Sequence, residues 1–299
     1  MHGQPKSTTL LPSITLPLHL PDRLLTGVLW CSASLSGLVL FSILAFLFAE
    51  SIPALQHIGI ERLTTDRAWH PTDGQFFILP VIVGTLLTAT GALFLATPLA
   101  ILSAIFCHWY APPPIAFFYR RLIELLAGIP SVVYGLWGLV VLVPLIGETH
   151  PPGSSLLAGI IILAIMVLPT IALLAQGSIA NVPQEFIRGG AALGLGRWAI
   201  LRGIVLPSAK SGLFTAILLG TGRAVGETMA VLMVCGNIVQ IPEHIFEPVR
   251  TLTANIALEM AYAMDDHRST LFVSGLILMG MVLVLVNLAE WFSRVKIYE

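Results

Sequence analysis

The sequence predicts an all-α membrane protein with six transmembrane helices. Of its 299 residues, 56% are hydrophobic and only 10% are charged, whereas a soluble globular domain carries about 25% charged residues. The mean hydropathy is +0.90, and six apolar stretches reach the roughly 20 residues that a helix needs to cross a bilayer. Because no water satisfies the backbone inside a bilayer, these stretches are expected to be helical.

The six stretches set the predicted order of elements. They run over residues 24–48, 76–107, 122–146, 155–176, 212–236 and 271–292. The first is longer than the core of a cleavable signal peptide and no small-x-small cleavage site follows it closely, so we expect it to remain as a signal anchor. The second is too long for one straight span, and Pro98 within it predicts a kink or a helix that continues beyond the membrane. Residues 1–23 and 293–299 are expected to be tails.

The distribution of lysine and arginine predicts that both tails lie in the cytoplasm. Cytoplasmic segments of membrane proteins carry an excess of these residues. With the N-terminus inside, the inner segments hold Lys6, Arg23, Arg120, Arg121, Arg188, Arg197, Arg202, Lys210, Arg294 and Lys296. The outer segments then hold Arg62, Arg67, Arg250 and Arg268. This asymmetry places residues 178–211 inside and residues 237–269 outside.

The outer segment 237–269 contains a regular apolar pattern. Leu252, Ile256, Met260 and Met264 recur at every fourth position, which predicts a short amphipathic helix at the outer surface. Such a helix would either cover the bundle or dock a partner, and the pattern does not separate the two.

Composition excludes two kinds of function. The net charge of −1 leaves no basic surplus to neutralise nucleic-acid phosphates. The eight histidines and three cysteines are scattered without the spacing of a zinc site. We therefore expect no nucleic-acid partner, no bound metal and no cofactor.

Two charges fall inside the fifth predicted span, Arg223 and Glu227. A charge at the bilayer centre costs a few kcal/mol, so such residues face a partner or a water-filled path. Four positions apart on a helix, they would share a face. The pair either neutralises itself and stabilises packing, or Arg223 meets an anionic substrate while Glu227 holds the guanidinium between turnovers. Arginine suits an oxyanion, because its planar donors bind bidentately and keep their charge.

A second candidate part of the path lies in the third predicted span. Residues 128–135 combine the helix-breaking Pro130 with the hydroxyl donors Ser131 and Tyr134. A broken helix at membrane depth is tolerated mainly where it is buried or lines a cavity. Ser131 and Tyr134 are therefore candidate path residues, unless the segment is only a kink. Thr228 of the fifth span, which also carries a hydroxyl, is a further candidate path residue.

The inner loop, residues 178–211, is too patterned to be a linker. Pro183 suits the first turn of a short helix, and Gly194 can end that helix and turn the chain. A second helix is expected to begin near Arg197 and to end before Pro207. The two would form a knob with apolar contact surface, contributed by Phe186, Leu193, Trp198 and Leu201.

The end of this loop resembles the EAA loop of bacterial ABC-importer permeases, Gly-x9-Ile-x-Leu-Pro, with Gly194 at its start and residues 204–207 at its end. In that family the loop sits in a groove of a separate ATPase subunit. The resemblance implies a coupling site that includes Phe186, Arg188, Gly189, Gly190, Gly194, Arg197, Trp198, Leu206 and Pro207. Where the family usually has Glu-Ala-Ala, this chain has Arg188-Gly189-Gly190. Either the groove of the partner differs correspondingly, or the coupling is looser, since glycine weakens a helix.

Three longer segments, residues 124–135, 222–237 and 251–257, resemble the C-type permease subunit of the bacterial phosphate importer, the Pst system. The paired A-type subunit typically has Ala-Pro where this chain has Met229-Ala230. The resemblance covers residues 76–292, approximately, and implies that this domain has the type I ABC-importer permease fold and forms the path for inorganic phosphate.

The resemblance also implies the partners: an A-type permease subunit, two copies of an ABC ATPase and an extracytoplasmic phosphate-binding protein, assembled in the bacterial inner membrane. The chain has no Walker A sequence, so ATP would be hydrolysed by another chain and this subunit would not be an enzyme.

Other functions remain open from the sequence. The substrate could instead be sulfate, molybdate or a phosphonate, or the chain could be a proton-coupled secondary transporter that uses Arg223 and Glu227 as a relay. An intramembrane enzyme is disfavoured, because the chain has no Gly-x-Ser-x-Gly turn, no paired membrane aspartates and no His-Glu-x-x-His.

Overall fold

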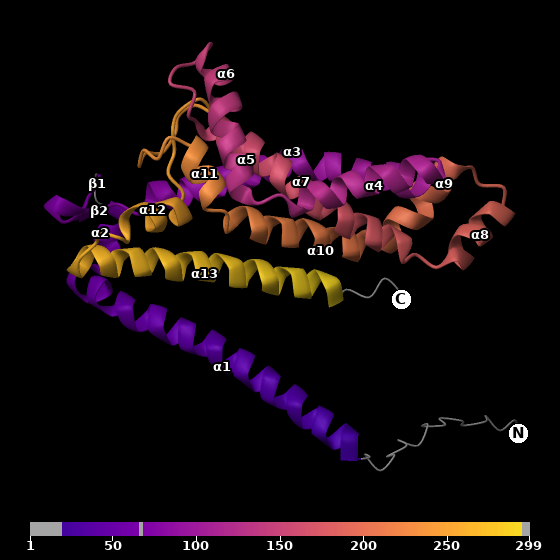
Figure 1. The fold of residues 1–299 in the computed structure, drawn as a ribbon, viewed down its shortest axis with the longest axis horizontal. Helices are drawn as coiled ribbons and strands as arrows, with labels where there is room; N and C mark the ends of the chain where they lie inside the picture. The colour runs from indigo at the N-terminus through magenta and orange to yellow at the C-terminus, as the bar shows by residue number, and fades with distance from the viewer. Residues whose placement is uncertain (1–19, 66–67, 295–299) are drawn as a thin grey trace, which may run out of the picture. The chain divides into compact units, whose positions relative to one another are not determined.

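The computed structural model describes residues 20–65 and 68–294, and these residues are almost entirely helical (Figure 1). Most of each predicted tail, residues 1–19 and 295–299, lies outside the described residues. Within the described part, five helices are long and apolar enough to cross a membrane, and a sixth span results if one bent helix pair is counted as a span. The all-α membrane fold is confirmed, with five to six candidate spans in the described residues.

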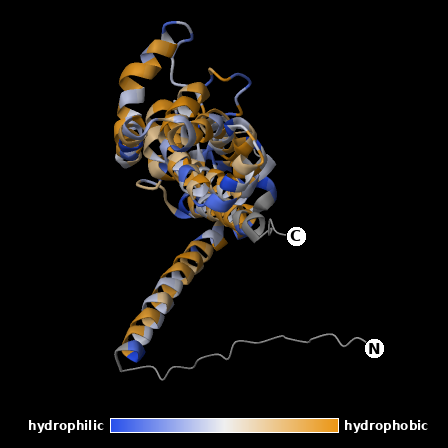
Figure 2. Ribbon diagram, turned by 90° about the vertical axis from the view of Figure 1, so that its right-hand side faces the viewer, coloured by the Kyte–Doolittle hydropathy of each residue, from blue (hydrophilic) through white to orange (hydrophobic). Residues whose placement is uncertain are grey.

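Helix α1, Leu20–His57, extends beyond the first predicted span at both ends. Residues 1–46 form a unit of their own, and residues 47–299 form a second. In the first unit the large apolar side chains are exposed, as at Trp30, which is 71% exposed, and hydrophobic colouring follows the helix in Figure 2. A helix that is apolar all round suits a lipid environment. Its retention as a signal anchor stays a prediction.

The core of the second unit is a bundle of long helices (Figure 1). These are α3 (Leu79–Ile105), α7 (Leu156–Ala180), α10 (Leu206–Val225) and α13 (Asp265–Arg294). On α3, the side chains of Ala92, Ala96 and Ala100 are fully buried and recur every four residues. On α10, a Cβ at Gly220 would lie 2.6 Å from Ile171 of α7. Small residues let membrane helices approach closely, which is the main source of packing energy in lipid.

Helix α3 passes through Pro98 without a break. It continues through a π-helical turn, Phe106–Tyr110, so that Leu79–Tyr110 forms one candidate span of 32 residues. Of the two expectations for this stretch, the continued helix is therefore the one observed.

The third predicted span, residues 122–146, is wrong as a single helix. Helix α4, Pro113–Gly128, ends at an extended Ile129, and the chain turns by 91° before it continues through α5, Ser131–Trp137. Pro130 has no N–H to continue the helix and disfavours a helical conformation at Ile129. Beyond α5 come a π-helical turn, Gly138–Leu142, and α6, Val143–Gly147.

The fifth predicted span, residues 212–236, is also broken. Helix α10 ends at Val225, and α11, Met229–Val234, begins after a break. Gly226 accommodates the end of α10 with its N–H donating to the carbonyl of Gly222 at 3.1 Å. This break divides the segment that holds the two predicted membrane charges.

The inner loop forms two helices at one end of the bundle (Figure 1). They are α8, Gln184–Ala192, and α9, Arg197–Ile200. Gly194 turns the chain between them in the left-handed region, with φ of 77°, where glycine carries no steric penalty. The expectation that the second helix ends before Pro207 is wrong. A π-helical turn, Leu201–Val205, joins α9 to α10, so that the helix continues through Pro207, the second residue of α10.

The opposite end of the bundle carries short elements (Figure 1). They are α2 (Gly59–Thr65), β1 (Trp69–His70), a 3₁₀ turn (Pro71–Asp73), β2 (Gln75–Phe76) and α12 (Leu252–Glu259); β1 and β2 pair antiparallel. The predicted amphipathic helix is shorter than the apolar pattern, because α12 ends before Met264. It is also more buried than predicted, since Asn255 and Glu259 on its polar side are 0% and 5% exposed.

Candidate functional site

The Arg223 side chain lies on the surface of the bundle, near the end of α10. Its Nη1 donates a hydrogen bond to Thr170 Oγ1 of α7 at 3.1 Å. Within the described residues it has no ion-pair partner. An exposed guanidinium on a helix that spans the membrane cannot face lipid at low cost. This face therefore suits contact with water or with another subunit.

Glu227 lies in the break between α10 and α11 and does not share a helix face with Arg223, so this part of the prediction is wrong. The reason is local: α10 ends at Val225, before a full turn beyond Arg223 is complete. Glu227 Oε1 instead accepts a hydrogen bond from the N–H of Ala230 at 3.0 Å and stabilises the start of α11.

The backbone of the same break is held by α12. The Thr253 hydroxyl donates to the carbonyl of Glu227 at 2.6 Å. Thr228 is half-buried, and its hydroxyl approaches the Gly226 carbonyl at 3.4 Å. The break thus has defined hydrogen-bond partners and is not an irregular loop.

The second broken helix packs directly against the first. A Cβ at Gly135 of α5 would lie 2.9 Å from the Cα of Ala230 in α11, which means that the two backbones touch. Tyr134 is buried, and its hydroxyl donates to the Leu126 carbonyl across the Pro130 bend at 2.8 Å. Ser131 is half-buried at the start of α5. The two predicted path segments, far apart in the sequence, therefore meet at their breaks.

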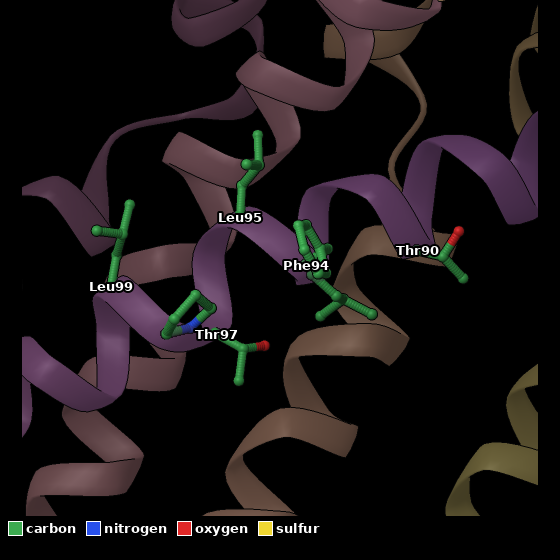
Figure 3. A pocket seen from close by; sticks show the side chains of 7 residues that line it. Thr90, Phe94, Leu95, Thr97 and Leu99 are labelled. Atoms are coloured by element: carbon green, nitrogen blue, oxygen red, sulfur yellow. The ribbon is translucent and has the colours of Figure 1, made fainter.

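A wide groove of about 880 Å³ runs along α3 and does not suit an oxyanion. Its lining residues are Thr90, Leu93, Phe94, Leu95, Thr97, Pro98 and Leu99 (Figure 3). Phe94 is 80% exposed, and the groove carries no charged side chain. Charged groups and N–H donors bind an oxyanion most strongly, so this apolar groove is not a candidate anion site.

A buried charged cluster lies at the opposite end of the unit from α8, and no pattern in the sequence predicts it. The Glu259 carboxylate forms an ion pair with Arg250 at 2.5 Å. It also accepts from Trp69 Nε1 at 2.8 Å and lies 2.8 Å from His267 Nε2. Four segments thus meet at the Glu259 carboxylate: β1, the segment that holds Arg250 just before α12, α12 itself and α13.

Arg250 in this cluster is further fixed by the backbone and by α12. Its Nε donates to the Asn237 carbonyl at 2.8 Å, and its Nη1 donates to Asn255 Oδ1 at 3.0 Å. Nearby, burial raises the pKa of the Tyr262 hydroxyl and the Glu259 charge raises it further, while Arg250 lowers it. No local pattern could have found the cluster, because Trp69 and Glu259 are 190 positions apart.

The residues predicted for the coupling site form a compact surface, which we call the α8–α9 knob, residues 181–211. Leu193 and Trp198 are 82% and 62% exposed, and Phe186 is 38% exposed. The side chains of Arg188, Arg197 and Pro207 are also exposed, and Leu206 is half-buried. Leu201, predicted to lie on the contact surface, is fully buried instead, because it packs into the base of the knob.

The two glycines of the Arg188-Gly189-Gly190 segment have different surroundings. A Cβ at Gly189 would meet nothing within 4 Å, whereas a Cβ at Gly190 would lie 2.7 Å from Ile204 and 3.3 Å from Ile200. Gly190 thus allows α8 to approach the segment that leads into α10. The second glycine, unlike the first, therefore lies in a packed contact.

This difference predicts opposite effects of alanine at the two positions. Gly189→Ala is expected to raise the stability of α8 by up to about 1 kcal/mol, because alanine favours the helix. Gly190→Ala is expected to lose that gain, because Ile204 must move to admit the methyl group. Thermal unfolding of the two purified variants in detergent checks the difference; equal midpoints would contradict it.

The long apolar helices, the two helix breaks, the exposed cation and the exposed knob together define a class, the membrane-spanning subunit of a transporter. The fold is that of a type I ABC-importer permease. A chain of the crystal structure of a bacterial alginate ABC transporter superposes with a TM-score of 0.64 at 16% identity, over 92% of this chain and 95% of that chain. A chain of the methionine ABC transporter MetNI, in an inward-facing conformation, superposes with a TM-score of 0.58 at 17% identity, over 73% and 96%.

The chain belongs to the family of binding-protein-dependent transport system inner membrane components, whose model matches residues 96–296. It is therefore a multi-pass inner-membrane protein. It is similar to the probable ABC transporter permease protein YqgH of Bacillus subtilis, with 40% identity over 77% of this chain and 76% of that protein.

Two further relatives cover more of the chain. They are the phosphate transport system permease proteins PstC of Mesorhizobium japonicum and of Haemophilus influenzae. Both are 34% identical to this chain. The match covers 90% of this chain and 87% of the Mesorhizobium protein, and 86% of this chain and 89% of the Haemophilus protein.

Proposed function

We propose that this chain is a permease subunit of an ATP-driven importer and forms part of the path for inorganic phosphate. The observation that carries the proposal is the exposed Arg223 guanidinium beside two broken helices. This guanidinium offers a fixed positive charge and planar donors to an oxyanion that passes along the helix breaks. The similarity to the two PstC proteins supports phosphate as that oxyanion.

The proposed path contains Arg223, Glu227, Thr228, Ser131 and Tyr134. Arg223 binds the anion. Glu227, through its bond to the Ala230 N–H, keeps the start of α11 in place. Tyr134 holds the bend between α4 and α5 through its bond to Leu126, while Ser131 and Thr228 supply hydroxyl donors.

The chain would work with partners that supply the energy and the substrate. We propose that it pairs with an A-type permease subunit. Two copies of an ABC ATPase bind the pair, one of them at the α8–α9 knob of this chain. An extracytoplasmic phosphate-binding protein docks at the end of the bundle opposite the knob. ATP is hydrolysed by the ATPase, and this subunit catalyses no reaction. Both termini and the knob then lie on the cytoplasmic side, as the arginine and lysine distribution favours.

Movement of the knob reaches the path through one continuous element. Arg197–Val225 forms a single helical segment of 29 residues that begins in α9 and ends two residues after Arg223. When the ATPases close and displace α9, this segment carries the displacement to the break beyond Val225. The breaks are the positions at which the helices can change direction without stretching a hydrogen-bonded turn. The path thereby switches between inward- and outward-facing states.

Reconstitution tests this function. The chain is combined with the other three kinds of subunit in proteoliposomes, and uptake of labelled phosphate, sulfate and molybdate is measured with and without ATP. Phosphate uptake is expected only with ATP and with an intact ATPase. Uptake of sulfate without phosphate would refute the substrate. Uptake that persists with an inactive ATPase but stops when the proton gradient is collapsed would indicate a secondary transporter.

A further inference from the structure

The α8–α9 knob carries a surplus of exposed positive charge. Its exposed cations are Arg188, Arg197, Arg202 and Lys210, against a single exposed acid, Glu185. In the described part of the chain, none of these five side chains forms an ion pair. Glu185 precedes Arg188 by three positions on α8, a spacing that permits an ion pair, yet the two do not pair. The knob thus presents unneutralised charge to whatever binds it.

Arg188 belongs to the same exposed knob as several large apolar side chains. Phe186 and Leu193, two positions before it and five after it, are exposed to 38% and 82%, and Trp198 of α9 to 62%. Exposed aromatic side chains and arginines are enriched in the energetically dominant part of an interface, so a partner that buries this knob would also bring its groups close to Arg188. A cation that becomes buried there requires an opposite charge on the partner.

The helix backbone that carries Arg188 is held in place by the fold of the knob. Gly190 lies against Ile200 and Ile204. The turn after α8 is closed by backbone hydrogen bonds from Leu195 N–H to the Gly190 carbonyl at 3.1 Å and from Gly194 N–H to the Ala191 carbonyl at 3.0 Å. The Arg-Gly-Gly segment therefore belongs to a well-packed helix. Of the two explanations for this segment, a loose coupling loop is the weaker, and a correspondingly different partner is the stronger.

We propose that Arg188 selects the ATPase that binds this permease: the groove that receives the knob carries a carboxylate opposite Arg188 and rejects a permease with an acidic residue at this position. The proposal rests on the proposed function, because the occupant of the surface is the ATPase subunit. Like charges brought together in a desolvated interface cost enough to exclude a wrong partner, while the matched pair adds affinity. Arg188 thereby prevents exchange of ATPases between related transporters in one cell.

The test measures binding of the cognate ATPase to the complete permease pair in a zwitterionic detergent. Arg188→Gln is expected to weaken binding several-fold, and Arg188→Glu by more than tenfold. The affinity of the unaltered protein should fall as salt is raised, and this salt dependence should become shallower in Arg188→Gln. Arg23→Gln, which removes an exposed arginine outside the knob, serves as the matched control and is expected to bind normally.

A charge-reversal selection completes the test. Variants of the ATPase that restore binding to Arg188→Glu are expected to replace an aspartate or glutamate in the groove by lysine or arginine, and to bind the unaltered permease poorly. Normal binding by Arg188→Glu would overturn the inference and leave the proposed function intact. An effect of Arg188 that appears only in vesicles with anionic lipid would also overturn it, because the arginine would then contact lipid. Failure of the unaltered permease to bind any ABC ATPase would instead refute the proposed function itself.

Discussion

Arg223→Gln is expected to abolish ATP-dependent phosphate uptake while the subunit still assembles with its partners. Glutamine is shorter than arginine and loses the single, exposed hydrogen bond to Thr170, so the packing of α10 on α7 changes little. It loses the fixed charge and the planar pair of donors on which the proposed anion site depends. The measurement is uptake of labelled phosphate in proteoliposomes, with assembly followed by co-purification of all subunits.

Three matched variants separate charge from packing. Arg223→Lys keeps the charge without the bidentate geometry and should retain a small part of the uptake. Thr170→Val removes the hydrogen-bond partner and keeps the guanidinium, so it should retain most of the uptake. Glu227→Gln can still accept the Ala230 N–H through its amide oxygen and therefore tests the negative charge alone. Normal uptake by Arg223→Gln would reduce Arg223 to a packing residue.

Glu259→Gln is expected to destabilise the protein by about 3–5 kcal/mol, the cost of leaving a buried charge without its partner. Arg250 and His267 are 17% and 12% exposed at their side chains, and Glu259 is 7% exposed. Removal of the carboxylate leaves the Arg250 guanidinium with only neutral acceptors, Asn237 and Asn255. Denaturation of the purified subunit by a graded detergent series measures the free energy of unfolding.

A double-mutant cycle shows whether the loss comes from the ion pair. Arg250→Gln combined with Glu259→Gln should cost less than the sum of the two single changes, because the double variant buries no unpaired charge. Glu124→Gln is the control, since Glu124 pairs with Arg120 and Arg121 on the exposed face of α4 and such pairs contribute little. If Glu259→Gln were no more harmful than Glu124→Gln, the cluster would not stabilise the fold.

Much of the fold was predictable because hydrophobic length is a local property. The four helices of the bundle correspond to apolar stretches that can be recognised without any knowledge of their neighbours. The bends were less predictable. Pro130 is a local signal for the first, but Gly226 is one of many glycines in the chain, and the break beside it depends on Thr253, which lies 26 positions from Glu227.

The residues of the candidate site were recognisable one by one, and their arrangement was not. A lone arginine in an apolar span identifies Arg223, because lipid does not tolerate an unpaired charge. Helical spacing then suggested Glu227 as its partner, and this was wrong because the helix ends between them. The cluster around Glu259 escaped prediction because its members come from four distant segments, each unremarkable by itself.

The sequence by itself determined that this protein spans a membrane, where four long apolar helices lie along the chain, and which residue types are available for an anion path and for a partner surface. These follow from hydrophobicity and charge, which each residue carries wherever it lies. The tertiary structure alone decided that the two broken helices touch through Gly135. It also decided that the Glu227 carboxylate accepts a hydrogen bond at the start of α11 and does not pair with Arg223. It also decided that Gly190 packs while Gly189 does not. Contacts of this kind depend on distances across the bundle, and no spacing along the chain encodes them.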